Sequence, residues 1–179
     1  MPAPAPHGPV PSPQQLRWHA MEFYGFLHFT VNTFTDREWG YGDENPAVFN
    51  PSALDARQWA RVARDAGMTG LILTAKHHDG FCLWPSAQSW NWNAVDIGPH
   101  RDLCGDLTRA VKAKGLKMGF YYSFYEWFNP LYRADPKRYV DEHMLPQLRD
   151  LVQRYQPDLV WPDGEWEHPA ELWKSTEFL

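Results

Sequence analysis

The sequence has few cysteines, no long apolar run and no excess of basic residues, and each lack excludes a class of protein. Two cysteines in 179 residues are too few for a disulfide framework or a cysteine-rich zinc site, so we expect Cys82 and Cys104 to be free thiols. No apolar run approaches the roughly 18 residues that a membrane span needs. A net charge of −5 without a basic patch argues against nucleic acid as a partner. The remaining composition, 44% hydrophobic and 22% charged, is that of one ordinary globular domain.

The N-terminal segment also lacks the basic and apolar stretches of a signal peptide. With Met1 as the start of translation, the expected compartment is by default the cytoplasm, and no motif specifies a localisation. Proline and alanine dominate residues 1–13, so we expect a flexible or polyproline-like tail there and a folded unit over residues 14–179.

Aromatic residues are abundant, at 16% with ten tryptophans. An exposed aromatic ring needs a partner, and the apolar face of a sugar is one candidate. The alternative is that the loops pack on themselves. Both interpretations apply to the tryptophans that lie in polar, turn-rich segments. These are Trp39, Trp84, Trp90, Trp92, Trp127 and Trp166.

Short apolar runs that favour β-strands recur along the chain, at residues 24–29, 70–74, 117–122 and 159–161. Their starts lie 46, 47 and 42 residues apart, which is too far for hairpins. Helical patterns fill the gaps between them. Asp55 is typical of a helix cap, and Asp135 followed by proline is typical of a helix start. The apolar positions expected on these three helices are Trp59, Val62, Ala63 and Ala66; Leu103, Leu107, Ala110 and Val111; and Tyr139, Val140, Met144, Leu148, Leu151, Val152 and Tyr155.

Strands and helices that alternate in this way predict an α/β fold with a parallel sheet. A doubly wound sheet would carry a glycine-rich turn after its first strand, and residues 28–32 contain none. Polar residues instead follow each strand, as in a (β/α)8 TIM-type barrel, whose site lies at the carboxyl ends of the strands. A whole barrel usually needs about 250 residues, so we expect only about the first four β/α units here. The polar residues in question are His28, His77, His78, Asp79, Tyr121, Tyr122, Ser123, Asp163 and Glu165.

Asp163 directly follows the fourth apolar run. A carboxylate held by a rigid strand suits a nucleophile, although Asp-Gly can equally be a plain turn. His77 and His78 suggest a metal site, but adjacent strand residues point to opposite faces, so hydrogen bonding to a substrate is the more natural role. The same alternation means that only one of Tyr121 and Tyr122 points toward the mouth of the barrel.

The long loop after the first strand contains Asp-Arg-Glu-Trp at residues 36–39. It can be a surface cluster of ion pairs or a loop of the site, because barrel sites are built from such loops.

These residues resemble the α-L-fucosidases, family 29 of the glycoside hydrolases, in family order over about residues 15 to 179. The matching stretches are residues 26–29 (Phe-Leu-His-Phe), 32–39 (Asn-Thr-Phe-Thr-Asp-Arg-Glu-Trp), 74–84 (Thr-Ala-Lys-His-His-Asp-Gly-Phe-Cys-Leu-Trp), 101–103 (Arg-Asp-Leu), 119–123 (Gly-Phe-Tyr-Tyr-Ser) and 159–166 (Leu-Val-Trp-Pro-Asp-Gly-Glu-Trp). The resemblance implies a retaining exo-glycosidase that acts on fucosylated oligosaccharides or glycoconjugates, without a cofactor or metal, and that can form homo-oligomers at full length.

The resemblance also implies roles for particular residues. Asp163 falls at the position of the family's nucleophile. The family's acid/base glutamate falls beyond residue 179. The expected substrate-binding residues are His28, Glu38, Trp39, His77, His78, Tyr121 and Trp161. Two other interpretations stay open: a metal-dependent barrel hydrolase that uses His77, His78 and Asp163, and a non-catalytic carbohydrate-binding fragment.

Overall fold

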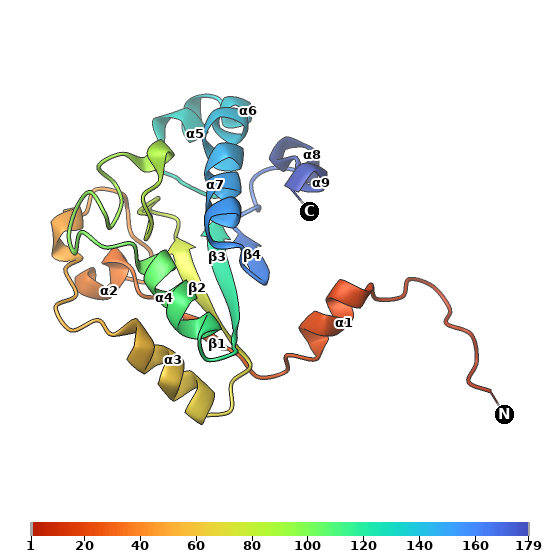
Figure 1. Cartoon of the computed structure of the whole chain (residues 1–179). Coiled ribbons are helices and arrows are strands. Elements are labelled where there is room, and N and C mark those ends of the chain that lie inside the picture. Colours follow the sequence, from red (N-terminus) through yellow and green to blue (C-terminus); the bar gives the residue numbers. More distant parts are fainter. Residues whose placement is uncertain (1, 179) are drawn as a thin grey trace.

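The computed structural model describes residues 2–178 and contains a parallel four-stranded sheet with helices between the strands (Figure 1). Strands β1 (Gly25–Leu27), β2 (Gly70–Lys76), β3 (Lys117–Ser123) and β4 (Leu159–Asp163) lie in the order β1-β2-β3-β4. Every neighbouring pair is parallel. The predicted α/β fold with a parallel sheet is therefore confirmed.

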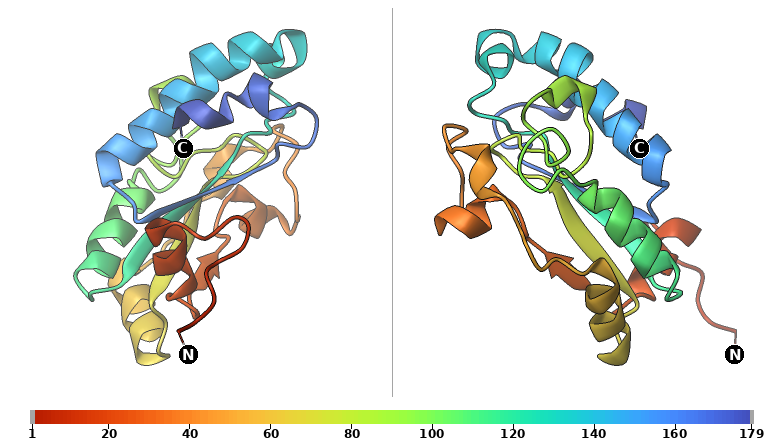
Figure 2. Two further views of the ribbon diagram at one scale, coloured as in Figure 1. Left: turned by 90° about the vertical axis from the view of Figure 1, so that its right-hand side faces the viewer. Right: turned by 60° about the vertical axis from the view of Figure 1, so that its left-hand side comes forward.

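Helices α3 (Ala56–Asp65), α4 (Leu103–Lys112) and α7 (Leu145–Tyr155) form a row along one face of this sheet (Figure 2). Side chains of β2 and β3 on the face toward these helices, such as Leu73 and Phe120, belong to the main hydrophobic core. Ile72, on the opposite face of β2, is also buried. The shorter elements are α1 (Pro13–His19), α2 (Val31–Thr35), η1 (Pro46–Val48), η2 (Ala87–Ser89), α5 (Pro130–Ala134), α6 (Pro136–Tyr139), η3 (Val140–Met144), α8 (Ala170–Trp173) and α9 (Ser175–Phe178).

Helices α3 and α4 lie where the sequence predicted them, α3 from its capping residue and α4 from its apolar positions. The Asp55 carboxylate accepts hydrogen bonds from two backbone N–H groups of the first turn of α3. All four apolar positions expected on α4 are buried. On α3 the prediction was partly wrong, because Val62 is 54% exposed and Ala66 is exposed. The buried stripe of α3 is instead formed by Ala56, Ala60 and Ala63, whose small side chains let the helix approach the sheet closely.

The helix expected from Asp135 is interrupted. Between α6 and α7 the segment η3 is a π-helix, in which the N–H of Leu145 donates to the carbonyl of Val140, five residues earlier. Pro146 has no backbone N–H and cannot donate the hydrogen bond that an α-helix would need at this position. The π-helical turn lies directly before this missing hydrogen bond. Val152, expected on the buried stripe, is 38% exposed.

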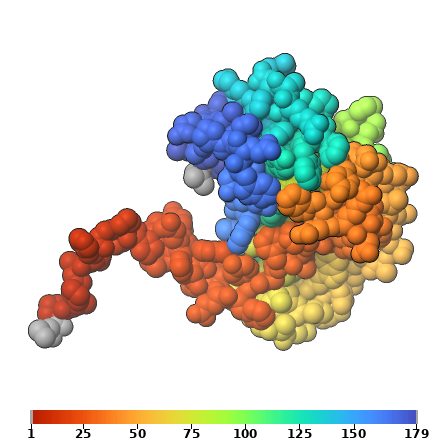
Figure 3. Space-filling view, turned by 180° about the vertical axis from the view of Figure 1, so that it is seen from behind, coloured from red at the N-terminus to blue at the C-terminus, as the bar shows by residue number. Residues whose placement is uncertain are grey.

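The N-terminal segment extends away from the body of the molecule (Figure 3). Residues 2–12 form no helix or strand and are exposed. Helix α1 begins at Pro13 with a capping box between Ser12 and Gln15, and its Trp18 contacts Trp161 at a ring-centroid distance of 6.0 Å. The flexibility of the tail stays a prediction.

Both cysteines are free, as expected from their number, and both are buried. Over residues 2–178, no helix combines the length and apolar character that crossing a membrane demands.

Candidate active site

The carboxyl ends of the four strands bring together the polar residues that the sequence singled out. Tyr121 Oη on β3 donates a hydrogen bond to Asp163 Oδ2 on β4, with an O–O distance of 2.5 Å. The rings of His28, just past β1, and His77, just past β2, lie 5.5 Å and 5.6 Å from the Tyr121 ring. His78 Nε2 lies 4.0 Å from Asp163 Oδ2. These five residues, predicted from strand ends, therefore form one cluster.

The pleat of the sheet selects which side chains reach this cluster. In the register of β3 and β4, Tyr121 pairs with Trp161, and Ser123 pairs with Asp163, so these residues share one face. Tyr122 points to the other face, where its hydroxyl donates to Gln147 in the helical layer. The expectation that only one of the two tyrosines reaches the site agrees with this geometry.

Asp163 is the last residue of β4 rather than part of the turn beyond it. The turn begins at Gly164, whose φ of +85° is readily adopted only by glycine. A Cβ atom on Gly164 would lie 2.6 Å from the Cβ of Tyr125, which would force the two loops apart. Asp163 is thus fixed by the strand before it and by a close-packed glycine after it.

The ring of His28 is oriented by a residue of the neighbouring strand. Thr74 Oγ1 lies 2.7 Å from His28 Nδ1, and the ring stacks on Phe26 with centroids 4.8 Å apart. Burial lowers the pKa of His28, although the charge of Asp163 acts in the opposite direction. Above its lowered pKa the imidazole is neutral, so it can exchange hydrogen bonds with a neutral ligand.

Ser123 determines which nitrogen of His78 carries the proton. Ser123 Oγ is 2.7 Å from the carbonyl oxygen of Tyr125, which can only accept, so the hydroxyl donates there. The His78 Nδ1, 2.6 Å from the same Oγ, must then be the donor of their shared hydrogen bond. Burial lowers the pKa of His78 to about 4 despite the nearby Asp163. At neutral pH, His78 Nε2 is therefore a bare acceptor that faces the site and suits a ligand hydroxyl.

His77 and His78 lie on the same side of the chain, contrary to the expectation from strand alternation. Their ring centroids are 4.3 Å apart. Strand β2 ends at Lys76, after a break in register between Thr74 and Lys76, so the alternation does not extend to the histidines. Burial, together with the charges of His78 and His28, lowers the pKa of His77 to about 3. Within residues 2–178, no group of three or more histidine, cysteine, aspartate or glutamate side chains is arranged to hold a metal ion.

Aromatic rings surround the polar cluster. Trp39 contacts His78 with a centroid distance of 5.0 Å and stacks on Trp166 at 5.9 Å with an interplanar angle of 11°. Trp161, 39% exposed, lies edge-on to Phe26 on the inner face of the sheet. Trp84 behaves differently, because it is fully buried and donates to Asp150, so for this residue packing is the correct interpretation.

A cavity of about 620 Å³ opens beside the cluster. Its wall includes the predicted residues His28, Glu38, Trp39 and His77, whereas Asp163 does not line it. Arg37 in this loop pairs with Glu44, at 3.5 Å, and the neighbouring Glu38 is exposed toward the cavity. The segment of residues 36–39 is thus a wall of the site.

Sequence reasoning named Ser123 and Trp166 without linking them to the histidines, and it gave no role to Thr74 and Tyr125. Thr74 and Ser123 orient His28 and His78, and Tyr125 and Trp166 contact the His78 ring at 5.8 Å and 5.4 Å. One available signal was the hydroxyl of Thr74 in an otherwise apolar strand, because a buried polar group needs a partner. The partner itself lies 46 residues away in the chain and is not visible in the sequence pattern.

The comparisons with known proteins agree on one family. A family model described as alpha-L-fucosidase matches residues 9–179. The alpha-L-fucosidase of Dictyostelium discoideum is 44% identical over 171 residues, which are 91% of this chain and 34% of that protein. The tissue alpha-L-fucosidase of Rattus norvegicus is also 44% identical, over 90% of this chain and 36% of its own length. The chain thus spans about a third of the length of these curated relatives.

Solved structures extend the similarity to the fold. A glycoside hydrolase 29 family member from an unknown rumen bacterium is 46% identical with a TM-score of 0.81, over 89% of this chain and 29% of that one. A GH29 alpha-L-fucosidase from Bacteroides thetaiotaomicron, solved as a trapped covalent intermediate with 2-fluoro-fucosyl fluoride, is 28% identical with a TM-score of 0.75. The match covers 90% of this chain and 44% of that chain.

Proposed function

The chain belongs to the α-L-fucosidase family, and from this premise we propose that the complete protein is a retaining exo-glycosidase that releases terminal α-L-fucose from glycans. Asp163 is the nucleophile in this proposal. We also propose that β1 to β4 are four of the eight units of a (β/α)8 barrel. The parallel order of the strands and the gathering of polar side chains at their carboxyl ends support this arrangement.

The geometry of Asp163 is the observation that carries the proposal. Its Oδ2 accepts the hydrogen bond from Tyr121, and within the described part of the chain its Oδ1 has no hydrogen-bond partner. The side chain is 32% exposed, so the carboxylate is accessible from solvent. A carboxylate with one oxygen anchored and the other free is held in the fixed orientation that attack on a sugar carbon requires.

The proposed reaction has two steps. The free oxygen of Asp163 forms a bond to the anomeric carbon while an acid gives its proton to the departing glycosidic oxygen. Water then attacks the same carbon, loses a proton to the conjugate base of that acid, and releases fucose and the Asp163 carboxylate. The trapped covalent intermediate of the Bacteroides thetaiotaomicron relative supports a covalent route. We assign the acid/base role to a carboxyl group outside the described residues.

The substrate-binding residues divide by chemistry. The neutral imidazoles of His28, His77 and His78 can exchange hydrogen bonds with sugar hydroxyls. The rings of Trp39 and Trp161 offer flat apolar faces to the carbon side of the sugar and its methyl group. Glu38 and Tyr121 complete the proposed set.

The test uses the complete protein and an aryl α-L-fucoside. Asp163→Asn should lower kcat at least 10²-fold, because the covalent step is lost. The matched control is Asp158→Asn, immediately before the first residue of the same strand, where the carboxylate pairs with Lys117. We expect the control to keep kcat within about threefold of the parent.

Two further measurements identify the role of Asp163. Treatment with 2-fluoro-fucosyl fluoride should attach one fluorofucosyl group to the peptide that contains Asp163, as read by mass spectrometry. Azide should partly restore turnover to Asp163→Gly, because the anion can replace the missing carboxylate. Near-normal turnover of Asp163→Asn, or a label on another carboxylate, would show that Asp163 is not the nucleophile.

A further inference from the structure

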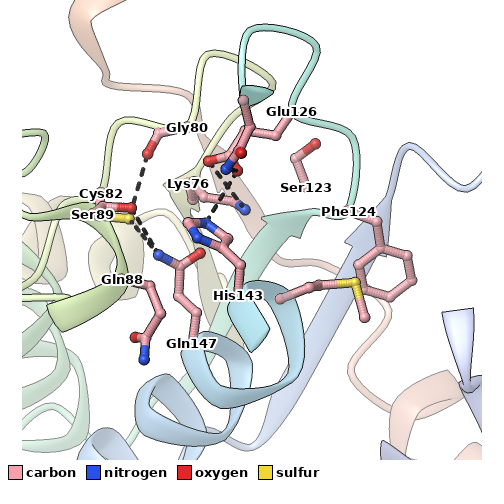
Figure 4. Close-up of polar contacts among 12 residues, drawn as sticks. Lys76, Gly80, Cys82, Gln88, Ser89, Ser123, Phe124, Glu126, His143 and Gln147 are labelled. Carbon is pink, nitrogen blue, oxygen red and sulfur yellow. Dashed lines mark hydrogen bonds and ion pairs between the residues drawn. The ribbon is translucent and has the colours of Figure 1, made fainter. Parts of the chain in front are cut away.

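A buried group of ionisable side chains lies on the helical side of the sheet (Figure 4). Lys76 is fully buried and Glu126 is 5% exposed. Lys76 Nζ lies 3.7 Å from Glu126 Oε1, and His143 Nε2 lies 3.1 Å from Glu126 Oε2. The proposed mechanism uses none of these three residues, which we call the buried triad.

Two members of the buried triad, Lys76 and Glu126, have further polar partners. Lys76 Nζ donates to Tyr122 Oη at 3.1 Å and lies 4.2 Å above the centre of the Tyr122 ring. Asn129 Nδ2 donates to Glu126 Oε2 at 2.9 Å. Burial alone would raise the pKa of Glu126, but Lys76, His143 and Asn129 outweigh it and hold this pKa at about 2. A buried carboxylate that stays ionised constrains its surroundings, because each charge must keep its partners.

The π-helical segment η3 supplies the third member of the buried triad. The bond from the Leu145 N–H to the Val140 carbonyl widens this turn by one residue, and His143 lies within it. Figure 4 shows His143 extending from this segment toward Glu126, and Gln147, on the following helix α7, extending toward Cys82 and Ser89. Wide turns of this kind are frequent at functional sites, where they direct a side chain that a regular helix would direct elsewhere.

The buried triad contacts the turn that carries the two site histidines. Lys76 immediately precedes His77 and His78 in the chain. Glu126 packs beneath the same turn at Gly80, where φ is +77° and a Cβ atom would overlap the Glu126 carboxylate. The loop of Glu126 directly follows Ser123, the last residue of β3, which fixes the tautomer of His78. The Lys76–Glu126 pair therefore joins the two segments that hold the His78–Ser123 hydrogen bond.

We propose that Lys76, Glu126 and His143 are positioning residues that hold the His77–Gly80 turn against the loop after β3 and thereby orient His78. This inference rests on the proposed function. Its physical basis is that a displacement of about 1 Å at a reacting group can lower a rate by about 10²-fold. The members of the buried triad act through His78 and are not proposed to contact the substrate.

The first test replaces His143 in the complete protein. His143→Leu removes the polar contact to Glu126 and should lower kcat/KM by about 10- to 100-fold. His143→Gln keeps a donor near the carboxylate and should restore kcat/KM to within about threefold of the parent. The matched control is Glu142→Gln, one residue away on η3, which breaks an exposed ion pair with Arg138 and should change kcat/KM less than twofold.

The second test removes both buried charges together. Lys76→Met with Glu126→Gln keeps the side-chain volumes similar and leaves no unpaired charge, so this variant should fold even where a single substitution does not. We expect it to show the same loss of kcat/KM, measured well below its unfolding midpoint. The ¹⁵N chemical shifts of His78 should change from one tautomer, with the proton on Nδ1, to a mixture of two.

Each outcome decides the proposal. Lowered unfolding midpoints with unchanged kcat/KM and an unchanged His78 tautomer would mean that the buried triad only stabilises the fold, and the proposal would be wrong. Equal losses in His143→Gln and His143→Leu would also contradict it. If the parent protein hydrolyses no fucoside, the proposed function fails, and the His78 ¹⁵N shifts alone decide whether the buried triad positions that ring.

Discussion

At the scale of single residues, small hydroxyl groups determine how the site histidines are presented. Ser123 donates to a carbonyl and therefore forces His78 to carry its proton on Nδ1. Thr74 Oγ1 likewise contacts His28 Nδ1 across neighbouring strands, at 2.7 Å. The acceptor that His78 presents to the site thus depends on a fully buried hydroxyl.

Ser123→Ala in the complete protein should therefore lower kcat/KM. Without the hydroxyl, His78 can adopt either tautomer and its ring loses its anchor, so we expect a loss of about tenfold, equivalent to about 1.4 kcal/mol. The measurement is the steady-state hydrolysis of an aryl fucoside. Ser52→Ala, at an exposed position outside the site, is the control and should behave like the parent. A Ser123→Ala enzyme with parental kcat/KM would contradict the role assigned to this hydroxyl.

Asp79 is a buried carboxyl group whose surroundings disfavour its ionised form. Burial is the main cause of its pKa of about 6, and the charges of Glu44 and Glu126 act in the same direction. Because the pKa is higher in the folded than in the unfolded chain, Asp79 stabilises the fold most at low pH. That contribution is lost as the pH rises from about 4 to 6.

Asp79→Asn should therefore raise the free energy of unfolding, relative to the parent protein, more at pH 7 than at pH 4. The amide oxygen can still accept the hydrogen bond from the Phe81 N–H, and the buried charge is removed. The expected difference between the two pH values is on the order of 2 kcal/mol. Thermal unfolding midpoints at both pH values measure it, with Asp65→Asn on the exposed side of α3 as control. An Asp79→Asn effect that is equal at pH 4 and pH 7 would rule out this explanation.

At the scale of elements, turns with left-handed residues decide how closely the loops of the site pack. Gly67 and Gly80 have similar φ angles, +82° and +77°. A Cβ atom on Gly67 would meet nothing within 4 Å, whereas one on Gly80 would overlap Glu126. These two positions separate the cost of backbone strain from the cost of displacing a loop.

Gly67→Ala should cost about 1–2 kcal/mol of unfolding free energy, which is the strain of a left-handed alanine. Gly80→Ala should cost more than Gly67→Ala, because Glu126 must also move and Lys76 loses its partner. Denaturant unfolding measures the stabilities, and fucoside hydrolysis measures the effect on the site. Only Gly80→Ala should lower kcat/KM. Equal effects of the two substitutions on both measurements would show that Glu126 yields without consequence.

At the scale of the whole molecule, burial falls toward the two edges of the sheet. Every residue of β2 is buried, and so is every residue of β3 except the first. The edge strands β1 and β4 contain only half-buried or exposed residues. Each edge strand pairs with a single neighbour, and Trp161 on β4 is 39% exposed on the inner face. Parallel sheets are normally covered on both faces, so this arrangement leaves apolar surface in water.

Residues 1–179 expressed alone should therefore unfold at low temperature or without cooperativity, and should lack measurable fucosidase activity. The assigned acid lies outside the described residues, and general acid–base assistance is worth about 10²–10⁴-fold in rate. Calorimetry and hydrolysis of an activated aryl fucoside test both expectations. A sharp melt from a monomer with strong turnover would refute them.

The sequence by itself determined the order of strands and helices and the strand ends that carry the site. Apolar runs and capping aspartates act over a few residues, so β2, β3, α4 and the position of Asp163 could be predicted. The family motifs determined the membership that the comparisons then showed.

The tertiary structure alone decided how the side chains are directed. A break in register beside β2 places His77 and His78 together, a π-turn before Pro146 directs His143 at Glu126, and small side chains turn a different face of α3 inward. The orientation of His78, for example, depends on Ser123, 45 positions along the chain. Local sequence patterns fix local backbone geometry, whereas register, tautomer and buried charge are set by contacts that exist only after the strands and helices have packed.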